Sequence, residues 1–313
     1  MESEPINKFR SEEERKVVLT PTEKEAVLRA DSSFSSIVSA VYFDNYDLPC
    51  PILVKVETDS GEFKEVVLRQ NRHGDVEKEM QMFKALEEFG FSVPKLLAGP
   101  FKNNIGESEA VYSLLPRENL QKLSMGSDQE LQTAKELLVQ AVVKLMDATT
   151  FIEKHLVSKS MPRLTLMAEL EQLNTEDNLW FGEKIFKSAV GYLQDVLKNV
   201  NTPLVISNGD YQPGNFLAKD GKITGYLDFE SASFQDPMMG FVKYPIYDLL
   251  PLSRTNIVEV FLRQKGFSKE DFCIRLALGC LKILKKEIPV TGGDKKTQEY
   301  RTRVLNLLQG SIS

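Results

Sequence analysis

The chain has 313 residues and a formal net charge of −6 at neutral pH. This length is sufficient for a substantial core and for two lobes. The acidic balance argues against nucleic acid as the main partner, because binding to nucleic acid depends on clustered Lys and Arg side chains that neutralise phosphates. We therefore expect a globular protein that does not act on nucleic acid.

The cysteine pattern and the hydropathy of the chain indicate in which cellular compartment the protein works. Cys50, Cys273 and Cys280 are widely scattered and form no C-x-x-C pair, which argues against a disulfide framework and a structural zinc site. Residues 1–16 are too charged for a secretory signal, and no apolar run approaches the roughly 20 residues of a membrane span. We expect a cytoplasmic protein with no membrane partner, and composition gives no indication of its oligomeric state.

The N-terminal third predicts a small sheet with one helix. Strand-like runs occupy residues 52–56, 63–69 and 110–115. Asp59-Ser60-Gly61 separates the first two as a turn cluster. Apolar residues recur at helical spacing over 76–86, Asp75 is in position to cap this helix, and Gly90 with Pro94 marks its end.

The second of these strands has two distinct faces. Alternation places Val67 and Arg69 on the same face. Glu79, on the helix that follows, is in a position to hold the Arg69 guanidinium through a bidentate pair. The alternative is an exposed surface pair without a function.

The pattern becomes helical after residues 113–116. Ser127 and Glu130 form a capping box that opens an amphipathic helix extending to Leu145. Further helices are expected at 186–197, 268–286 and 297–308. We therefore expect an α+β protein with an N-terminal lobe at 1–116 and a larger, mainly helical lobe at 117–313.

The run Ser207–Phe216 carries the strongest functional signal. Asn215 follows Asp210 by five residues, and Asp228 comes thirteen residues later. Asp220-Gly221 predicts a hairpin that returns Asp228 towards Asn215. A carboxylate for an acceptor hydroxyl and oxygen ligands for Mg²⁺ are what phosphoryl transfer needs. The alternative is a set of ordinary turn residues, and the second carboxylate and the hairpin weigh against it.

These residues resemble the aminoglycoside phosphotransferase and choline kinase-like family, whose loop has the form H-x-D-x-x-x-x-N before a strand ending in I/L-D-W/F-E. Asn208-Gly209-Asp210 and Leu227-Asp228-Phe229-Glu230 carry the match. Asn208 stands where that family usually has histidine, and Asp236-Pro237 is not followed by the family's common Asp-Leu-Ala. The resemblance implies a two-lobed, protein-kinase-like fold.

The resemblance also implies roles. Asp210 falls on the family's catalytic aspartate, and Asn215 and Asp228 fall on its two metal ligands. The implied cofactors are therefore ATP and Mg²⁺.

In the N-terminal lobe, the resemblance gives the second strand and the hinge a nucleotide-binding role. Arg69 is expected to reach the α- and β-phosphates while Glu79 holds it. Val67 and Leu115, which lies in the hinge, are expected at the adenine. Kinases usually cover the phosphates with a glycine-rich loop, but residues 31–36 contain no glycine. Either serine hydroxyls substitute there or the segment is an ordinary turn, and we assign it no site residue.

The expected activity is transfer of the γ-phosphate of ATP to a hydroxyl of a small molecule. Acidic residues follow Pro162, namely Glu169, Glu171, Glu176 and Asp177. They suit an amino-sugar or amino-alcohol if they face the cleft, and are otherwise a solvated surface. Only seven residues separate Asp228 from Asp236, which leaves little room for the activation segment of a protein kinase.

A second hypothesis is a catalytically degenerate kinase-fold protein that binds nucleotide or a protein partner. Asn208 and the glycine-free segment 31–36 motivate it. The presence of Asp210, Asn215 and Asp228 argues against this second hypothesis.

Overall fold

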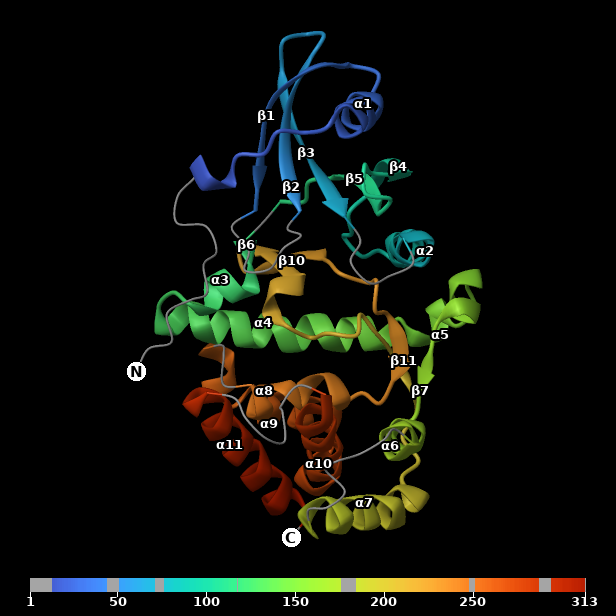
Figure 1. Cartoon of the computed structure of the whole chain (residues 1–313), viewed down its shortest axis with the longest axis vertical. Coiled ribbons are helices and arrows are strands. Elements are labelled where there is room, and N and C mark those ends of the chain that lie inside the picture. Colours follow the sequence, from blue (N-terminus) through green and yellow to red (C-terminus); the bar gives the residue numbers. More distant parts are fainter. Residues whose placement is uncertain are drawn as a thin grey trace. The chain divides into compact units, whose positions relative to one another are not determined.

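The computed structural model describes residues 13–43, 51–70, 76–116, 118–175, 184–247, 251–286 and 294–312. The chain divides into two compact units. Unit 1 comprises the described parts of residues 1–117, 155–160 and 224–231, and unit 2 comprises the remainder. Unit 1 contains a five-stranded sheet, and most of the helices belong to unit 2 (Figure 1).

The sheet of unit 1 is antiparallel, with the strand order β1-β2-β3-β5-β4. Its strands are β1 (Phe34–Tyr42), β2 (Ile52–Thr58), β3 (Phe63–Gln70), β4 (Leu96–Lys102) and β5 (Ser108–Ser113). The predicted strands at 52–56, 63–69 and 110–115 are confirmed as β2, β3 and β5. Buried and half-buried positions alternate along β2, the pattern that made it predictable.

The two edge strands were not predicted. Strand β1 pairs with β2 through two register shifts, so its burial does not alternate regularly. Strand β4 contains Gly99-Pro100, which reads as a turn in sequence, and it also pairs irregularly with its neighbour. Proline is tolerated on an edge strand because one side of that strand needs no ladder hydrogen bond.

Unit 1 has two longer helices where the sequence predicted one. Helix α2 (Val76–Glu88) is the predicted helix, and the residue proposed as its cap, Asp75, lies outside the described residues. Helix α1 (Pro21–Arg29) begins with a capping box between Thr20 and Glu23. Val27 of α1 packs into the core formed by one face of the sheet (Figure 1).

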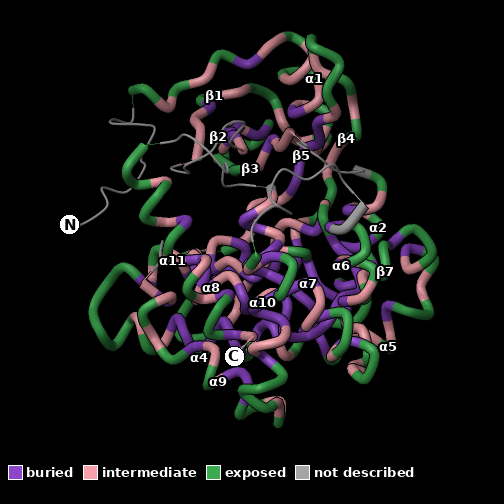
Figure 2. The backbone as a smooth tube through the Cα atoms, turned by 60° about the horizontal axis from the view of Figure 1, so that its bottom comes forward, coloured by how far each residue is buried: buried purple, intermediate pink, exposed green. Residues whose placement is uncertain are grey.

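The helix predicted to start at Ser127 and those predicted at 186–197, 268–286 and 297–308 are confirmed in unit 2, and the structure adds shorter helices that were not predicted. The helices of unit 2 are α3 (Leu120–Ser124), α4 (Asp128–Asp147), α5 (Thr149–Ile152), α6 (Leu166–Thr175), α7 (Lys184–Val196), α8 (Lys243–Ile246), α9 (Ile257–Lys265), α10 (Lys269–Lys286) and α11 (Lys295–Ser311). The predicted capping box opens α4, because Ser127 and Glu130 exchange side-chain to backbone hydrogen bonds. Buried positions run along α4 and α10 (Figure 2). No helix in the described part of the chain is long and apolar enough to cross a membrane.

Two small sheets frame the predicted catalytic loop. One has the order β7 (Arg163–Leu164), β11 (Ser233–Gln235), β8 (Val205–Ser207), and the other the order β10 (Lys222–Tyr226), β9 (Phe216–Lys219), β6 (Glu118–Asn119). The predicted hairpin is confirmed, since Asp220 and Gly221 both have positive φ between β9 and β10. The loop therefore starts where β8 ends and finishes where β9 begins.

Candidate active site

Asn215 is tied to the backbone of the predicted base in unit 2. Its side-chain nitrogen Nδ2 donates a hydrogen bond to the carbonyl oxygen of Asp210, at 3.0 Å. This bond fixes which end of the amide is the acceptor. Among the described residues, Oδ1 of Asn215 accepts only a long hydrogen bond, 3.4 Å from Nε2 of Gln212. The amide oxygen is therefore available as a metal ligand.

Asn208 supports the loop from inside. It is buried, and its Oδ1 accepts a hydrogen bond from the backbone N–H of Asp210 at 3.2 Å. Ser207 acts similarly, because its hydroxyl oxygen accepts from the N–H of Gly209 and from Nε2 of Gln235. Asparagine thus holds the turn through its own short side chain at the position where the resembling family has histidine.

Asp210 has a partner that sequence reasoning missed. The Nζ of Lys243, on α8, forms an ion pair with Oδ1 of Asp210. The Asp210 side chain is 38% exposed and the Lys243 side chain 23% exposed. No local motif marks Lys243, because it lies 33 residues beyond Asp210.

Helix α8 and the segment before it pack closely behind the loop. The hydroxyl of Tyr244 donates to the carbonyl oxygen of Tyr211 at 2.7 Å. A Cβ atom added to Gly240 would lie 2.1 Å from the ring of Tyr211. Glycine is therefore required at position 240 for the tyrosine ring to occupy this place.

In unit 1, the guanidinium of Arg69 lies between its predicted partner Glu79 and the predicted metal ligand Asp228. Arg69 donates from NH1 to Oε1 of Glu79 and from NH2 to Oδ1 of Asp228, both at 2.8 Å. Oε2 of Glu230 lies 3.8 Å from NH2. The Glu79 side chain is fully buried and that of Arg69 is 19% exposed. The pair predicted between Arg69 and Glu79 is present and is not an exposed surface pair, but it is not the bidentate pair that was predicted, because NH2 of Arg69 bonds to Asp228 instead of Glu79.

The charges in this cluster do not balance. Burial raises the pKa of Glu79 above its usual value, although Arg69 pulls it down. Burial would lower the pKa of Arg69, but the carboxylates of Glu79, Asp228 and Glu230 together raise it. Oε2 of Glu79 and Oε2 of Glu230 are buried and have no hydrogen-bond partner in the described part of the chain. Unpaired buried oxygens and excess negative charge suit a cation.

Asp228 has an uncommon backbone conformation. Its φ is +62°, in the left-handed region that non-glycine residues rarely enter. The next residue, Phe229, donates its backbone N–H to Oε1 of Glu79 at 3.0 Å, and its ring packs edge-on against Phe83 of α2. Arg69 holds the Asp228 carboxylate itself. Strain of this kind persists only where the surroundings impose it, and it concentrates at functional sites.

The predicted adenine-facing residues also lie in unit 1. Val67 is half-buried and shares a face of β3 with Arg69, while Val66 and Leu68 point into the core beneath α1. Leu115 is half-buried in the hinge after β5. The hydroxyl of Thr224 donates to the carbonyl oxygen of Pro116 at 2.8 Å, which fixes the end of that hinge.

The serine-rich segment is a turn followed by a strand. The backbone N–H and hydroxyl of Ser33 both donate to Oδ1 of Asp31. The hydroxyls of Ser35 and Ser36 donate to the backbone and side chain of Glu57. These contacts favour the ordinary-turn interpretation of residues 31–36.

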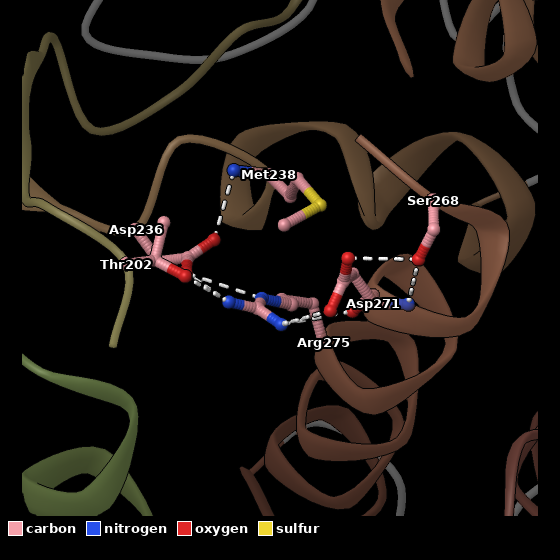
Figure 3. Close-up of polar contacts among 6 residues, drawn as sticks. All are labelled: Thr202, Asp236, Met238, Ser268, Asp271 and Arg275. Atoms are coloured by element: carbon pink, nitrogen blue, oxygen red, sulfur yellow. Dashed lines mark hydrogen bonds and ion pairs between the residues drawn. The ribbon is translucent and has the colours of Figure 1, made fainter. Parts of the chain in front are cut away.

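Asp236 belongs to a buried network in unit 2 (Figure 3). Its Oδ2 accepts from Nε and NH2 of Arg275, at 3.1 and 2.8 Å, and its Oδ1 accepts from the N–H of Met238. Arg275 also donates to the hydroxyl of Thr202 and to the carbonyl oxygen of Asp271. The aspartate of the Asp-Pro pair therefore fixes the chain between β11 and α8.

The site residues therefore form two sets. Arg69, Glu79 and Asp228 meet in unit 1, whereas Asp210 and Asn215 meet in unit 2. That Asn215 and Asp228 share one Mg²⁺ stays a prediction. The described residues contain no group of three or more His, Cys, Asp or Glu side chains arranged to hold a metal. Mg²⁺ is commonly bound by one or two protein oxygens together with substrate phosphates, so an amide oxygen and a carboxylate fit it.

The sequence was compared with known families and proteins. Residues 53–253, more than half of the chain, match the model of the phosphotransferase enzyme family. No curated protein matches the sequence.

Solved structures with the same fold include an aminoglycoside phosphotransferase, APH(4)-Ia, with a TM-score of 0.64 and 12% identity, covering 94% of this chain and 98% of that chain. The choline kinase LicA from Streptococcus pneumoniae has a TM-score of 0.57 and 14% identity, covering 91% of this chain and 98% of that chain. A complex of APH(2")-IIia with GDP and kanamycin has a TM-score of 0.57 and 14% identity, covering 92% and 97%. Other structures of APH(4)-Ia contain ADP or AMP-PNP together with hygromycin B.

At these identities the structural matches establish the fold, and they confirm the predicted α+β, two-lobed, kinase-like class. The family match extends from β2 to the 3-10 turn that precedes α9, so it includes β3, the catalytic loop and α8. The chain belongs to the phosphotransferase enzyme family.

Proposed function

We propose that the protein is an ATP- and Mg²⁺-dependent kinase that transfers the γ-phosphate to a hydroxyl group of a small molecule. The observation that carries this proposal is the cluster in unit 1, where one guanidinium faces three carboxylates, and two buried carboxylate oxygens accept no hydrogen bond from the described residues. Mg²⁺ fits this cluster because its charge offsets the surplus of carboxylates, and the phosphates of ATP fit it because they pair with the guanidinium and the metal.

Each residue has a role in this proposal. Arg69, held by Glu79, binds the α- and β-phosphates, and Val67 and Leu115 contact the adenine. Asp228 and Asn215 hold Mg²⁺, which would neutralise charge on the transferred group. The nucleotide-binding lobe is then 1–116 and the catalytic lobe is 117–313. Residues 224–231, which include Asp228, follow the catalytic loop in sequence but belong to unit 1.

Asp210 is the base. The acceptor oxygen forms a bond to the γ-phosphorus while the bond to the bridging oxygen breaks and ADP leaves, and the hydroxyl proton passes to Asp210. Among the described residues, Lys243 is the partner of Oδ1 of Asp210, and no partner of Oδ2 is found. Oδ2 is thus open to a hydroxyl.

Small-molecule acceptors are supported by the relatives. Solved structures with the same fold include complexes with hygromycin B or kanamycin and a choline kinase. An amino-sugar or an amino-alcohol is therefore one candidate class of acceptor. A cytoplasmic location belongs to the same proposal, because the unpaired cysteine pattern suits a reducing compartment.

Transfer of ³²P from ATP to a panel of hydroxyl compounds, with and without Mg²⁺, tests the proposal. We expect Asp210→Ala to abolish transfer and to leave binding of Mg²⁺–ATP largely intact, since the base is not a metal ligand. Asp195→Ala, at an exposed position of helix α7, is the control and should transfer normally.

Equal loss of binding and transfer in Asp210→Ala would place Asp210 in the metal site or in the fold. Mg²⁺-dependent ATP binding by the wild type without transfer to any hydroxyl compound would support the degenerate kinase-fold hypothesis instead.

A further inference from the structure

Lys243 is the part of the candidate site that neither the sequence motif nor the proposed mechanism uses. Its ammonium group lies against Oδ1 of the base, Asp210. The lysine is held in place by its helix, because α8 is anchored through Tyr244, which is buried and bonded to the backbone of Tyr211 in the catalytic loop. The backbone carbonyl of Lys243 also accepts from the N–H of Tyr247 at 2.7 Å. The positive charge is thus a fixed feature of the loop's surroundings.

The pairing leaves the base able to work. Lys243 occupies one carboxylate oxygen of Asp210, and the other is open among the described residues. A hydroxyl that approaches this second oxygen comes close to the ammonium group on the first. Two positive charges held side by side repel each other, and such repulsion lowers the affinity for a ligand that carries the second charge. An acceptor with a cationic group beside its hydroxyl is therefore disfavoured.

A second acidic residue of unit 2 is also neutralised internally. Glu169 on α6 is one of the residues that suggested a cationic acceptor, and its Oε1 is bonded to Nζ of Lys282 on α10. Its side chain is only 10% exposed. Lys285, one turn further along α10, donates to the carbonyl oxygen of Leu173 on the same helix α6. Glu176 and Asp177 lie outside the described residues.

We propose that Lys243 is a specificity-determining residue that excludes cationic acceptors from the base. The acceptor is then an uncharged or acidic hydroxyl compound, such as a polyol or a hydroxy acid, rather than an amino-sugar or an amino-alcohol. This inference rests on the proposed function, since it takes Asp210 to be the base. The ion pair acts by neutralising the charge of Asp210, so that no net negative charge is left to attract an external cation.

Ligand-observed NMR titration of choline and of kanamycin into the whole protein tests the inference without any turnover. In Lys243→Met the carboxylate of Asp210 loses its internal cation and becomes a site for an external one. We expect this variant to bind either probe at least about tenfold more tightly than the wild type does. Lys243→Arg keeps the charge and should behave like the wild type. The double variant Asp210→Asn/Lys243→Met should lose the gain, which locates the gained binding at Asp210.

The inference would be overturned if the wild type bound choline or kanamycin as tightly as Lys243→Met does. It would also be overturned if neither the wild type nor Lys243→Met bound either compound. Lys243→Gln, which keeps a polar side chain on α8, gives the same test if the methionine variant does not fold. The two proposals fail separately, because loss of the proposed kinase function would appear as absent ATP binding or phosphate transfer, which this titration does not measure.

Discussion

Arg275 in unit 2 and Arg69 in unit 1 both bind carboxylates where little solvent reaches, but they are matched to their partners differently. Arg275 pairs closely with Asp236 at 2.8 Å, where both side chains are almost fully buried, and the exposed carboxylate of Asp271 lies 3.9 Å away. Both oxygens of Asp236 accept hydrogen bonds, and Arg275 also donates to Thr202 and to the backbone of Asp271 (Figure 3).

Arg69 instead faces two carboxylates at 2.8 Å, those of Glu79 and Asp228, and a third, that of Glu230, at 3.8 Å. Oε2 of Glu79 and Oε2 of Glu230 have no hydrogen-bond partner among the described residues, and Asp228 has a positive φ. A closed network leaves nothing with which to bind a ligand, so it stabilises the fold. A cluster with surplus charge and open oxygens is costly until a ligand completes it. The difference between the two networks separates the scaffold from the site.

The largest effect is expected from breaking the closed network. Arg275→Met leaves the Asp236 carboxylate buried without its counter-ion, and breaking a buried pair in this way costs about 3–5 kcal/mol. Urea denaturation followed by circular dichroism measures this loss. Adding Asp236→Asn to Arg275→Met should restore part of it, because the uncompensated charge is removed. A decrease of less than about 1 kcal/mol in the free energy of unfolding would contradict the role given to this network.

A smaller loss is expected where the ring of Tyr211 packs behind the loop. Gly240→Ala places a Cβ atom against the ring of Tyr211, and overpacking of this kind costs about 1–3 kcal/mol. Gly191→Ala in α7 is the matched control, since nothing lies within 4 Å of its added Cβ. The control should gain up to about 1 kcal/mol from higher helix propensity. Equal unfolding free energies for the two variants would show that Tyr211 moves freely.

Features that depend on residues close together in the sequence could be predicted, whereas contacts between residues far apart in the sequence could not. The turn at Asp220-Gly221 and the capping box at Ser127 depend on neighbouring residues, so they were predictable. The five-residue spacing of Asp210 and Asn215 is also local, and the hydrogen bond between them is present.

The pairs that were missed join distant parts of the chain. Lys243 lies 33 residues from Asp210, and Arg275 lies 39 residues from Asp236. No period or motif in a single sequence links such residues, because only the packing of α8 and α10 brings them together. Strands β1 and β4 were missed for another reason, since register shifts interrupt the alternation on which strand prediction depends.

The smallest effect on stability is expected in the open cluster and depends on pH. Burial raises the pKa of Glu79 above its usual value of 4.5, so the folded protein binds this proton more tightly than the unfolded chain does. The stability contributed by the protonated group is present below pH 4.5 and is lost as pH rises through the raised value. Glu79→Gln should lack this decline in urea denaturation curves recorded across that window. A parallel decline in the variant would assign the pH dependence to other groups.

Calorimetric titration of ATP with and without Mg²⁺ into the wild type, Asp228→Asn and Asp220→Asn tests the central claim most directly. Asparagine tolerates positive φ, so both variants keep the backbone conformation of the aspartate they replace. We predict Mg²⁺-dependent binding of ATP by the wild type and by the Asp220→Asn control, and binding at least about tenfold weaker by Asp228→Asn, since a metal ligand is lost. Unchanged Mg²⁺-dependent affinity in Asp228→Asn would contradict the assignment of the open cluster as the nucleotide and metal site.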